Sequence, residues 1–322
     1  MMQFLFILET IFTQGLPVCL IAIGIFLTFR LLDFADMTAE GSFLISAAIT
    51  VVSINKGFNP FVATLFAFLG GAACGIITGV LNRFLKVPKL LSGIITMTAA
   101  GGLVYFIMGF NDLTKTFNGS VSLGDKDTIY SLFYGLPGDN LMWQIIVMLT
   151  FVIVIMAGIY FFFGTEYGMA IRSTGMNEKM AQAQGINTTA ATIICIAISN
   201  ALIALGASLI YQEGGEVKLG IESGRLVIGL AAVLIGESVF GKRSFKNWLI
   251  SVALGAIVYY TIITIALNVG SSEFQSAMDK IKRLIYALLI VIAICLPLIK
   301  QGFKNIFNKI FKKKPKESEV NV

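Results

Sequence analysis

The chain has 322 residues, of which 57% are hydrophobic and only 13% are charged, with a formal net charge of +6. A soluble domain carries about 25% charged residues, so this composition excludes one. Several runs of 18 or more residues are nearly free of charge, which predicts transmembrane helices. The runs are continuous and do not alternate in roughly ten-residue units, which favours helices over a membrane β-barrel. We therefore predict an all-α fold, a polytopic transmembrane helical bundle.

The content of histidine and cysteine limits the chemistry. Histidine is absent, and Cys19, Cys74, Cys195 and Cys295 all lie in apolar runs without CxxC spacing. Cysteines in such runs behave as small buried hydrophobic residues. We therefore expect no metal site and no histidine-based catalysis. Glu9 and the lack of a basic leader also argue against a cleaved signal peptide.

About nine spans are expected, all within residues 1–299. Residues 4–8 are expected to be an apolar lead too short to cross, and the second span should start near Asp36 and hold Asp36 and Glu40 in its first turns. The expected spans are 11–29, 36–54, 61–81, 90–110, 141–163, 188–210, a shorter 226–241, 248–269 and 284–299. Residues 300–322 form a basic tail, in which apolar side chains on one helical face predict an interfacial helix on the inner leaflet.

Short basic loops give the orientation. The loops at 82–89 and 242–246 each carry three basic residues and no acidic one, and the tail after residue 300 is rich in lysine. The positive-inside rule places all three in the cytoplasm, with the N-terminus outside and the C-terminus inside. The acidic loop 111–140 then lies outside. The loop 270–283 runs against the rule, because its basic residues would also lie outside.

The longest polar, mixed-charge interval with helical character lies between two apolar runs, at residues 165–187. It contains no proline, and residues 177–183 suit a short helix, with Gly175 before it and Gly185 as its C-terminal stop. A short helix exposed to the cytoplasm between two spans can bind a cytosolic partner.

Polar residues near or inside the spans are candidates for function. Asp36 and Glu40 lie with Asp33 at a span boundary, either as functional groups or simply at the water interface beside Arg30. Asn200, in the middle of a span, needs a hydrogen-bond partner on another helix or lines a polar path.

Two further patterns favour structural interpretations. Glu237 lies near basic Lys242 and Arg243, which predicts an interfacial ion pair. The spacing of Gly71, Gly75 and Gly79 places three glycines on one helix face, where a neighbouring helix can approach closely.

Residues 236–242 fit the first seven positions of a phosphate-binding loop. Arg243 stands where that motif needs Ser or Thr, and a membrane helix replaces the preceding strand. We therefore expect no nucleotide or other cofactor on this chain.

The segment GTEYGMAIRSTGMNEKMAQAQGIN resembles the cytoplasmic coupling segment of permeases of bacterial binding-protein-dependent ABC importers, in the branched-chain amino acid and ribose-type family. The matching positions are Thr165, Gly168, Arg172, Gly175, Asn177, Ala181, Gly185, Ile186 and Asn187. LLDFADMTAEGSFLISAA is similar to an early element of that family through Asp36, Gly41 and Ser42. GLAAVLIGESVFGKR is similar to a later one, although Glu237 and Lys242 replace two of its glycines.

The resemblance implies a permease domain over residues 1–299, in the bacterial cell membrane, without enzymatic activity. By resemblance, two copies of the permease would also pair as a homodimer. Two cytoplasmic ATPase subunits would bind ATP and Mg, and an extracellular substrate-binding lipoprotein would deliver the solute. The implied solute is an amino acid, with aromatic ones as the narrower expectation; a sugar or a nucleoside is the alternative. Residues expected to couple to the ATPase are Gly168, Arg172, Gly175, Asn177, Glu178, Lys179, Ala181, Gly185 and Asn187. Candidates for the solute pathway are Asp36, Glu40, Ser42, Asn200 and Glu237.

In the coupling segment, the glycines at 168, 175 and 185 would set the entry and exit angles, and Arg172, Glu178 and Lys179 would make polar contacts with the ATPase.

Two other classes of membrane protein remain as alternatives. A stand-alone secondary transporter or channel needs ion-coupling residues or a filter, for which the chain offers only residues 33–40 and Glu237. A membrane enzyme acting on lipid is disfavoured by the lack of histidine.

Overall fold

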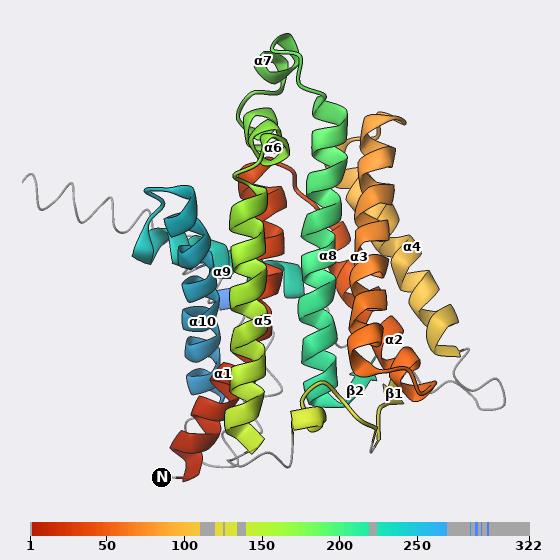
Figure 1. Cartoon of the computed structure of the whole chain (residues 1–322), viewed down its shortest axis with the longest axis vertical. Helices are drawn as coiled ribbons and strands as arrows, with labels where there is room; N and C mark the ends of the chain where they lie inside the picture. Colours follow the sequence, from red (N-terminus) through yellow and green to blue (C-terminus); the bar gives the residue numbers. More distant parts are fainter. Residues whose placement is uncertain are drawn as a thin grey trace, which may run out of the picture.

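The computed structural model describes residues 2–109, 120–124, 126–133, 140–218 and 224–268, with isolated positions between 284 and 295. In this part of the chain the fold is a nearly all-helical bundle (Figure 1). Its elements are α1 Met2–Phe26, the π-helical η1 Leu27–Leu31, α2 Thr38–Asn55, α3 Pro60–Arg83, α4 Lys89–Gly109, β1 Ser120–Ser122, the 3₁₀ turn η2 Ser131–Phe133, α5 Asn140–Phe162, α6 Glu166–Met176, α7 Glu178–Ala183, α8 Thr188–Gly214, β2 Glu216–Lys218, α9 Arg225–Phe240 and α10 Phe245–Asn268.

Seven stretches of the described residues are long and apolar enough to cross a membrane. They are Glu9–Leu31, Thr38–Asn55, Pro60–Arg83, Lys89–Gly109, Leu141–Phe162, Thr188–Gly214 and Phe245–Ala266. At 16 residues α9 is shorter, as expected for the segment 226–241. Most of the expected span 284–299, the loop 270–283 and the basic tail 300–322 lie outside the described residues, so the expected count of nine is not confirmed.

The expected apolar lead at residues 4–8 is the first part of α1, which runs without interruption from Met2, and the candidate span begins after it, at Glu9. Glu9 and Thr10 are polar, but neither breaks a helix. The expected placement of Asp36 in the first turn of the second span is wrong. The helix begins at Thr38, and Asp36 lies before it in the connection after η1, where its carboxylate accepts a hydrogen bond from the Thr38 N–H at 2.9 Å. Only Glu40 lies in the first turn of α2.

The centre of the bundle is α8, which packs against α1, α2 and α3, while α9 and α10 pack against α1. The glycines of α3 allow its close approach to α8. A Cβ atom at Gly75 would lie 2.5 Å from the Ile196 carbonyl oxygen, and one at Gly71 would overlap Ala204. Gly79 lies one turn further along, beside Ile193. Close backbone packing of this kind replaces the hydrophobic driving force that is missing between helices in lipid.

A small β-sheet departs from the all-α expectation. β1 and β2 pair antiparallel, with Val121 opposite Val217, and the Leu123 N–H donates to the Gly215 carbonyl at 2.7 Å. Gly215 ends α8 in the left-handed conformation, with φ +69°, which turns the chain into β2. The sheet joins part of the acidic loop to the end of α8.

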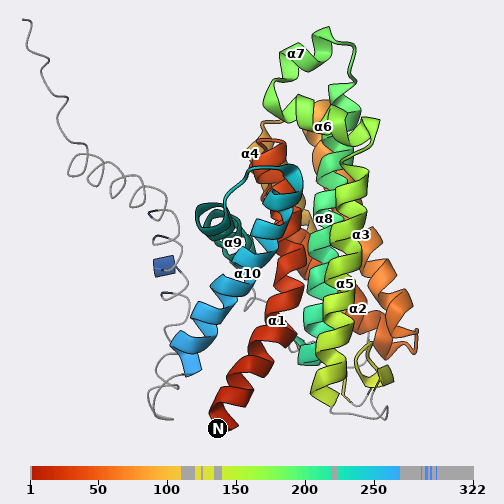
Figure 2. The same cartoon turned by 60° about the vertical axis from the view of Figure 1, so that its left-hand side comes forward.

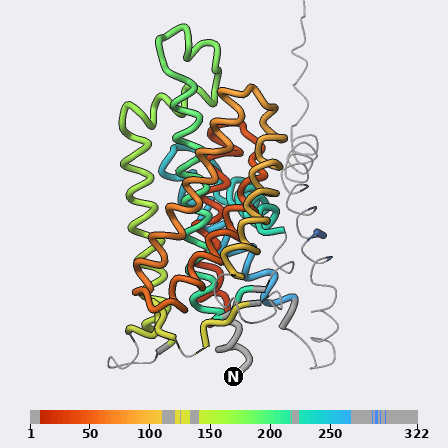
Figure 3. The backbone as a smooth tube through the Cα atoms, turned by 90° about the vertical axis from the view of Figure 1, so that its right-hand side faces the viewer, coloured from red at the N-terminus to blue at the C-terminus, as the bar shows by residue number. Residues whose placement is uncertain are grey.

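The two ends of the bundle differ in character. α6 and α7 protrude at one end, and β1 and β2 lie at the other, where α1 also begins (Figures 1 and 2). The tube view in Figure 3 shows the same polarity, with residues 165–187 at the top of the molecule and the start of α1 at the bottom. Arg83 and Lys89 share a pocket with Asn177, and Lys242 shares one with Arg172. The two basic loops and the segment 165–187 therefore lie at the same end.

Candidate functional site

Residues 165–187, which we call the α6–α7 element, form two helices where the sequence predicted one. Three side chains cap successive helix starts. The Gly168 N–H donates to Thr165 Oγ1 (3.4 Å), the Met180 N–H to Asn177 Oδ1 (3.1 Å) and the Ala190 N–H to Asn187 Oδ1 (3.0 Å). N-caps satisfy backbone donors that a helix leaves unpaired. The spacing of these three residues thus determines where α6, α7 and α8 begin.

The glycines of the element are required by close packing or by backbone conformation. Gly168 is buried, and a Cβ atom there would overlap the backbone of Phe163. Gly175 packs on the end of η1, where a Cβ atom would overlap the Leu31 carbonyl. Gly185 has open space around it but a φ of +83°, which suits glycine at the end of α7. The element is therefore held at a fixed angle to the first span.

Two of the charged residues expected to contact a partner are engaged within the chain. The Arg172 guanidinium lies 5.1 Å from the centre of the Phe245 ring, at the start of α10. Glu178 forms an ion pair with Arg83 at the end of α3, and Arg83 also donates to the Thr192 hydroxyl on α8. Lys179 is exposed. Arg172 and Glu178 thus tie the element to α10 and α3, whereas the Lys179 side chain points to solvent.

The sequence analysis did not predict that apolar residues of the element would be exposed. Met176 is 88% exposed, Met180 59% and Tyr167 70%. Ala181, on the other side of α7, is buried. The available signal is the spacing of Met176 and Met180, four residues apart in a polar stretch, because methionine side chains suit adaptable binding surfaces. Exposed apolar surface at a protruding tip is typical of an interaction site.

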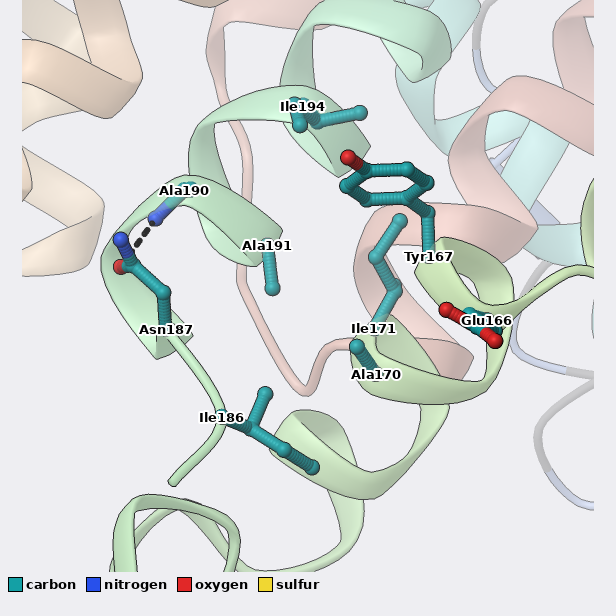
Figure 4. A pocket seen from close by; sticks show the side chains of 9 residues that line it. All are labelled: Glu166, Tyr167, Ala170, Ile171, Ile186, Asn187, Ala190, Ala191 and Ile194. Atoms are coloured by element: carbon teal, nitrogen blue, oxygen red, sulfur yellow. Dashed lines mark hydrogen bonds between the residues drawn. The ribbon is translucent and has the colours of Figure 1, made fainter.

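A groove of about 290 Å³ lies between α6 and the first turns of α8 (Figure 4). Its lining is largely apolar and includes Tyr167, Ile171 and Ile194, with Ile186 from the connection between α7 and α8. In Figure 4 the Asn187 side chain turns toward the backbone of Ala190 and away from the groove. The groove continues the apolar surface of the element along its side.

Three predicted pathway residues meet in the bundle interior. Asn200 of α8 donates from Nδ2 to Asp36 Oδ2 at 2.7 Å, and its Oδ1 accepts from the Ser42 hydroxyl of α2, also at 2.7 Å. All three side chains are buried. A buried carboxylate is costly unless it is fully hydrogen-bonded, and here both oxygens accept a bond. The cluster fixes α2 and its preceding connection against α8.

Asp36→Asn is expected to lower the free energy of unfolding by about 1–3 kcal/mol. The new amide NH₂ group would face either the Thr38 N–H or the Asn200 NH₂ group, so two hydrogen-bond donors would meet without an acceptor. Thermal unfolding in detergent measures the loss. Asp33→Asn is the matched control, since Asp33 is exposed and its φ of +49° is one that Asn tolerates. The exchange Asp36→Asn with Asn200→Asp should restore part of the stability. Equal unfolding temperatures for the Asp33 and Asp36 variants would contradict this account.

The remaining two pathway candidates lie apart from this cluster. Glu40 is half-buried and accepts a hydrogen bond from the Gly224 N–H, at the start of α9, at 3.0 Å. Glu237 pairs with Arg30 at 2.7 Å and accepts from Trp248 Nε1 at 2.9 Å. The predicted ion pair therefore forms with Arg30 of η1 in place of Lys242 or Arg243. Arg30 lies 207 positions before Glu237, so the sequence alone did not indicate this pair, and tertiary packing brings the two side chains together.

The fold is similar to that of a solved ABC transporter. A solved inward-facing structure described as a metal-chelate type ABC transporter superposes with a TM-score of 0.53 at 15% identity, covering 88% of this chain and 85% of that one. At that identity the similarity concerns the fold alone.

The sequence defines the family. Residues 7–294 match the branched-chain amino acid transport system permease component, and the chain belongs to this family. The tyrosine transport system permease protein of Clostridioides difficile (strain R20291) is 32% identical over 268 residues, 81% of this chain and 83% of the relative. The probable branched-chain amino acid transport permease LivH of Methanocaldococcus jannaschii is 24% identical (78% and 84% covered), and the fructose import permease FruF of Bifidobacterium longum (strain NCC 2705) is 26% identical (72% and 64%). The family resemblance expected from the sequence is confirmed.

Proposed function

We propose that this chain forms the solute pathway of an ATP-driven importer and that the α6–α7 element is the docking site of the ATPase subunit. The observation that carries this proposal is the tip of the element, where Met176 at the end of α6 and Met180 on α7 are both exposed, and where α7 protrudes from the bundle (Figure 2). A short helix with an exposed apolar face suits a groove on a partner. The motif residues fix the position of the helix, and the exposed residues beside them make the contact.

The sidedness follows from charge. The loops 82–89 and 242–246 lie at the end that carries the α6–α7 element, and both are basic. We place this end in the cytoplasm and the β1–β2 end outside, with the N-terminus outside and the C-terminal tail inside.

The same contacts would transmit movement. A displacement of α7 acts on α3 through the Glu178–Arg83 ion pair, and a displacement of α6 acts on η1 through Gly175. Transport needs an element with two positions whose populations nucleotide binding shifts. Rigid attachment to several spans allows a movement at the tip to reach the pathway.

The assembly proposed here has two copies of the permease, two ATPase subunits and an extracellular substrate-binding lipoprotein. ATP and Mg bind to the ATPase, and this chain carries no catalytic step. Homologues of this chain are ABC permease subunits, which are not themselves enzymes.

The proposed solute is an amino acid, with an aromatic one as the narrower choice. The tyrosine permease at 32% identity supports it, and sugar permeases such as FruF at 26% keep a sugar or a nucleoside as the second candidate. Within the pathway we assign Glu40 the most direct part, since it is half-buried beside the start of α9. Asp36, Ser42 and Asn200 would shape the pathway through α2, and Glu237 would do so at its cytoplasmic end.

Uptake into proteoliposomes tests this function. The chain is reconstituted with its ATPase and its binding protein, and labelled tyrosine and labelled ribose are compared with and without ATP inside. We expect tyrosine uptake that depends on both ATP and the ATPase. Uptake without either would identify a secondary transporter, and ATP-dependent uptake of ribose alone would replace the amino acid by a sugar.

A further inference from the structure

A second pocket lies at the cytoplasmic end, and Gly175 and Met176 of the α6–α7 element form part of its lining. It lies where η1, the α6–α7 junction and the turn between α9 and α10 meet, and its volume is about 320 Å³. The charged and aromatic residues that line it are Arg30, Arg172, Lys242, Arg243, Phe245 and Trp248. Three separate parts of the chain thus supply cations to one hollow.

The positive charge of the pocket is only partly balanced. The nearby acid Glu237 has both carboxylate oxygens engaged, by Arg30 at 2.7 Å and by the Trp248 N–H at 2.9 Å. Arg30 Nε is buried and has no hydrogen-bond partner among the described residues. The pocket therefore holds donors and positive charge that an anion can satisfy.

Aromatic rings hold two of the cations in place. The Arg172 guanidinium lies 5.1 Å from the centre of the Phe245 ring, and Lys242 Nζ lies 5.8 Å from the centre of the Trp248 ring. A cation over a ring face keeps its N–H groups available for an anion, and it loses little conformational entropy when one binds. The side chains are thus positioned before any ligand arrives.

The position in the membrane indicates the source of the anion. Among the described residues, Leu31 ends one candidate span and Phe245 begins another, so the pocket lies at the level where spans leave the hydrocarbon. Tryptophan favours that interface, and basic pockets between helices on the cytoplasmic side bind anionic headgroups. We propose that this pocket binds the phosphate of an anionic phospholipid of the inner leaflet. The proposal rests on the sidedness given above.

Tryptophan fluorescence gives a local test, because Trp248 lies in the pocket and the chain has only two tryptophans. The full-length Trp143→Phe protein is placed in phosphatidylcholine nanodiscs doped with brominated phosphatidylglycerol or with brominated phosphatidylcholine. We expect the anionic lipid to quench Trp248 with an apparent affinity about tenfold higher than the zwitterionic one. Removing two pocket cations with Lys242→Gln and Arg243→Gln should bring this ratio close to one.

The matched control removes the same charge outside the pocket. Lys179→Gln with Lys246→Gln changes two exposed cations at the same end that do not line the pocket, and it should keep the preference. Loss of the preference in both double variants would show a general surface charge effect and overturn the proposal.

Two further results would also overturn it. Relief of the quenching by millimolar inorganic phosphate would show that the pocket takes free phosphate. An unchanged lipid preference in the Lys242/Arg243 variant, together with loss of ATPase co-purification, would assign the pocket to a protein contact. A wrong sidedness would leave the lipid preference intact, and thiol labelling reports it separately.

Discussion

Replacing Met180 and Ala183 by glutamate together should abolish ATP-dependent uptake. Both side chains are exposed on α7 at the tip of the molecule, so the isolated chain tolerates the charges. In the docked state each carboxylate would be buried against the ATPase without a partner. Burying an unpaired charge commonly costs about 3 kcal/mol or more, and a loss of that size weakens binding of the ATPase roughly 100-fold. Uptake and ATPase co-purification measure the effect.

The control for this variant places one charge on an equally exposed apolar residue at the other end of the bundle. Leu132, on η2, is 48% exposed, and Leu132→Glu should leave ATPase binding unchanged. Both variants should give the same elution profile and unfolding temperature as the wild type. Normal uptake by the Met180/Ala183 variant would show that α7 does not carry the contact.

Gly75→Leu is expected to cause the largest loss of stability. A Cβ atom at this position would lie 2.5 Å from the Ile196 carbonyl oxygen, and α8 cannot yield there because backbone atoms make the contact. Overpacking of a well-packed core costs about 1–3 kcal/mol, and a clash with backbone belongs at the upper end or beyond. We expect little monodisperse protein after detergent extraction, and a clearly lower unfolding temperature for what remains.

Gly102→Leu is the matched control. Gly102 lies in α4, and a Cβ atom there has no other atom within 4 Å. Leucine also favours both helix and lipid, so this variant should be at least as stable as the wild type. If the two variants unfold at the same temperature, the packing of α3 on α8 does not depend on the glycine at position 75.

The sequence predicted the spans well because apolar length is the dominant signal in a membrane protein. The ranges expected for α3, α4 and α5 differ from the observed ones by only one or two residues. Boundaries set by local polar contacts were harder to predict, as the start of α2 illustrates. Asp36 bonds to the Thr38 N–H and to Asn200 of a distant helix, and only the second of these bonds requires the tertiary fold.

Pairings between distant residues explain most of what the sequence could not predict. Val121 and Val217 come from two polar loops, and nothing in either loop indicates the other. The partner of Glu178 is Arg83, 95 positions earlier. In the α6–α7 element the residues of the family motif mostly cap the helices and allow their close packing. Met180, which is exposed, lies between them and is not one of the matched motif positions.

The docking of the ATPase on the α6–α7 element is tested most directly by thiol protection at its tip. Cys19, Cys74 and Cys195 are buried, and Cys295 is half-buried, so a Cys295→Ser parent protein should give a low background with a membrane-impermeant maleimide. In inverted membrane vesicles stripped of ATPase, Met180→Cys should react readily, and Leu132→Cys should not. Adding back the ATPase should protect position 180 from labelling. If position 180 is labelled only from the outside, or equally with and without bound ATPase, the α6–α7 element is not the docking site.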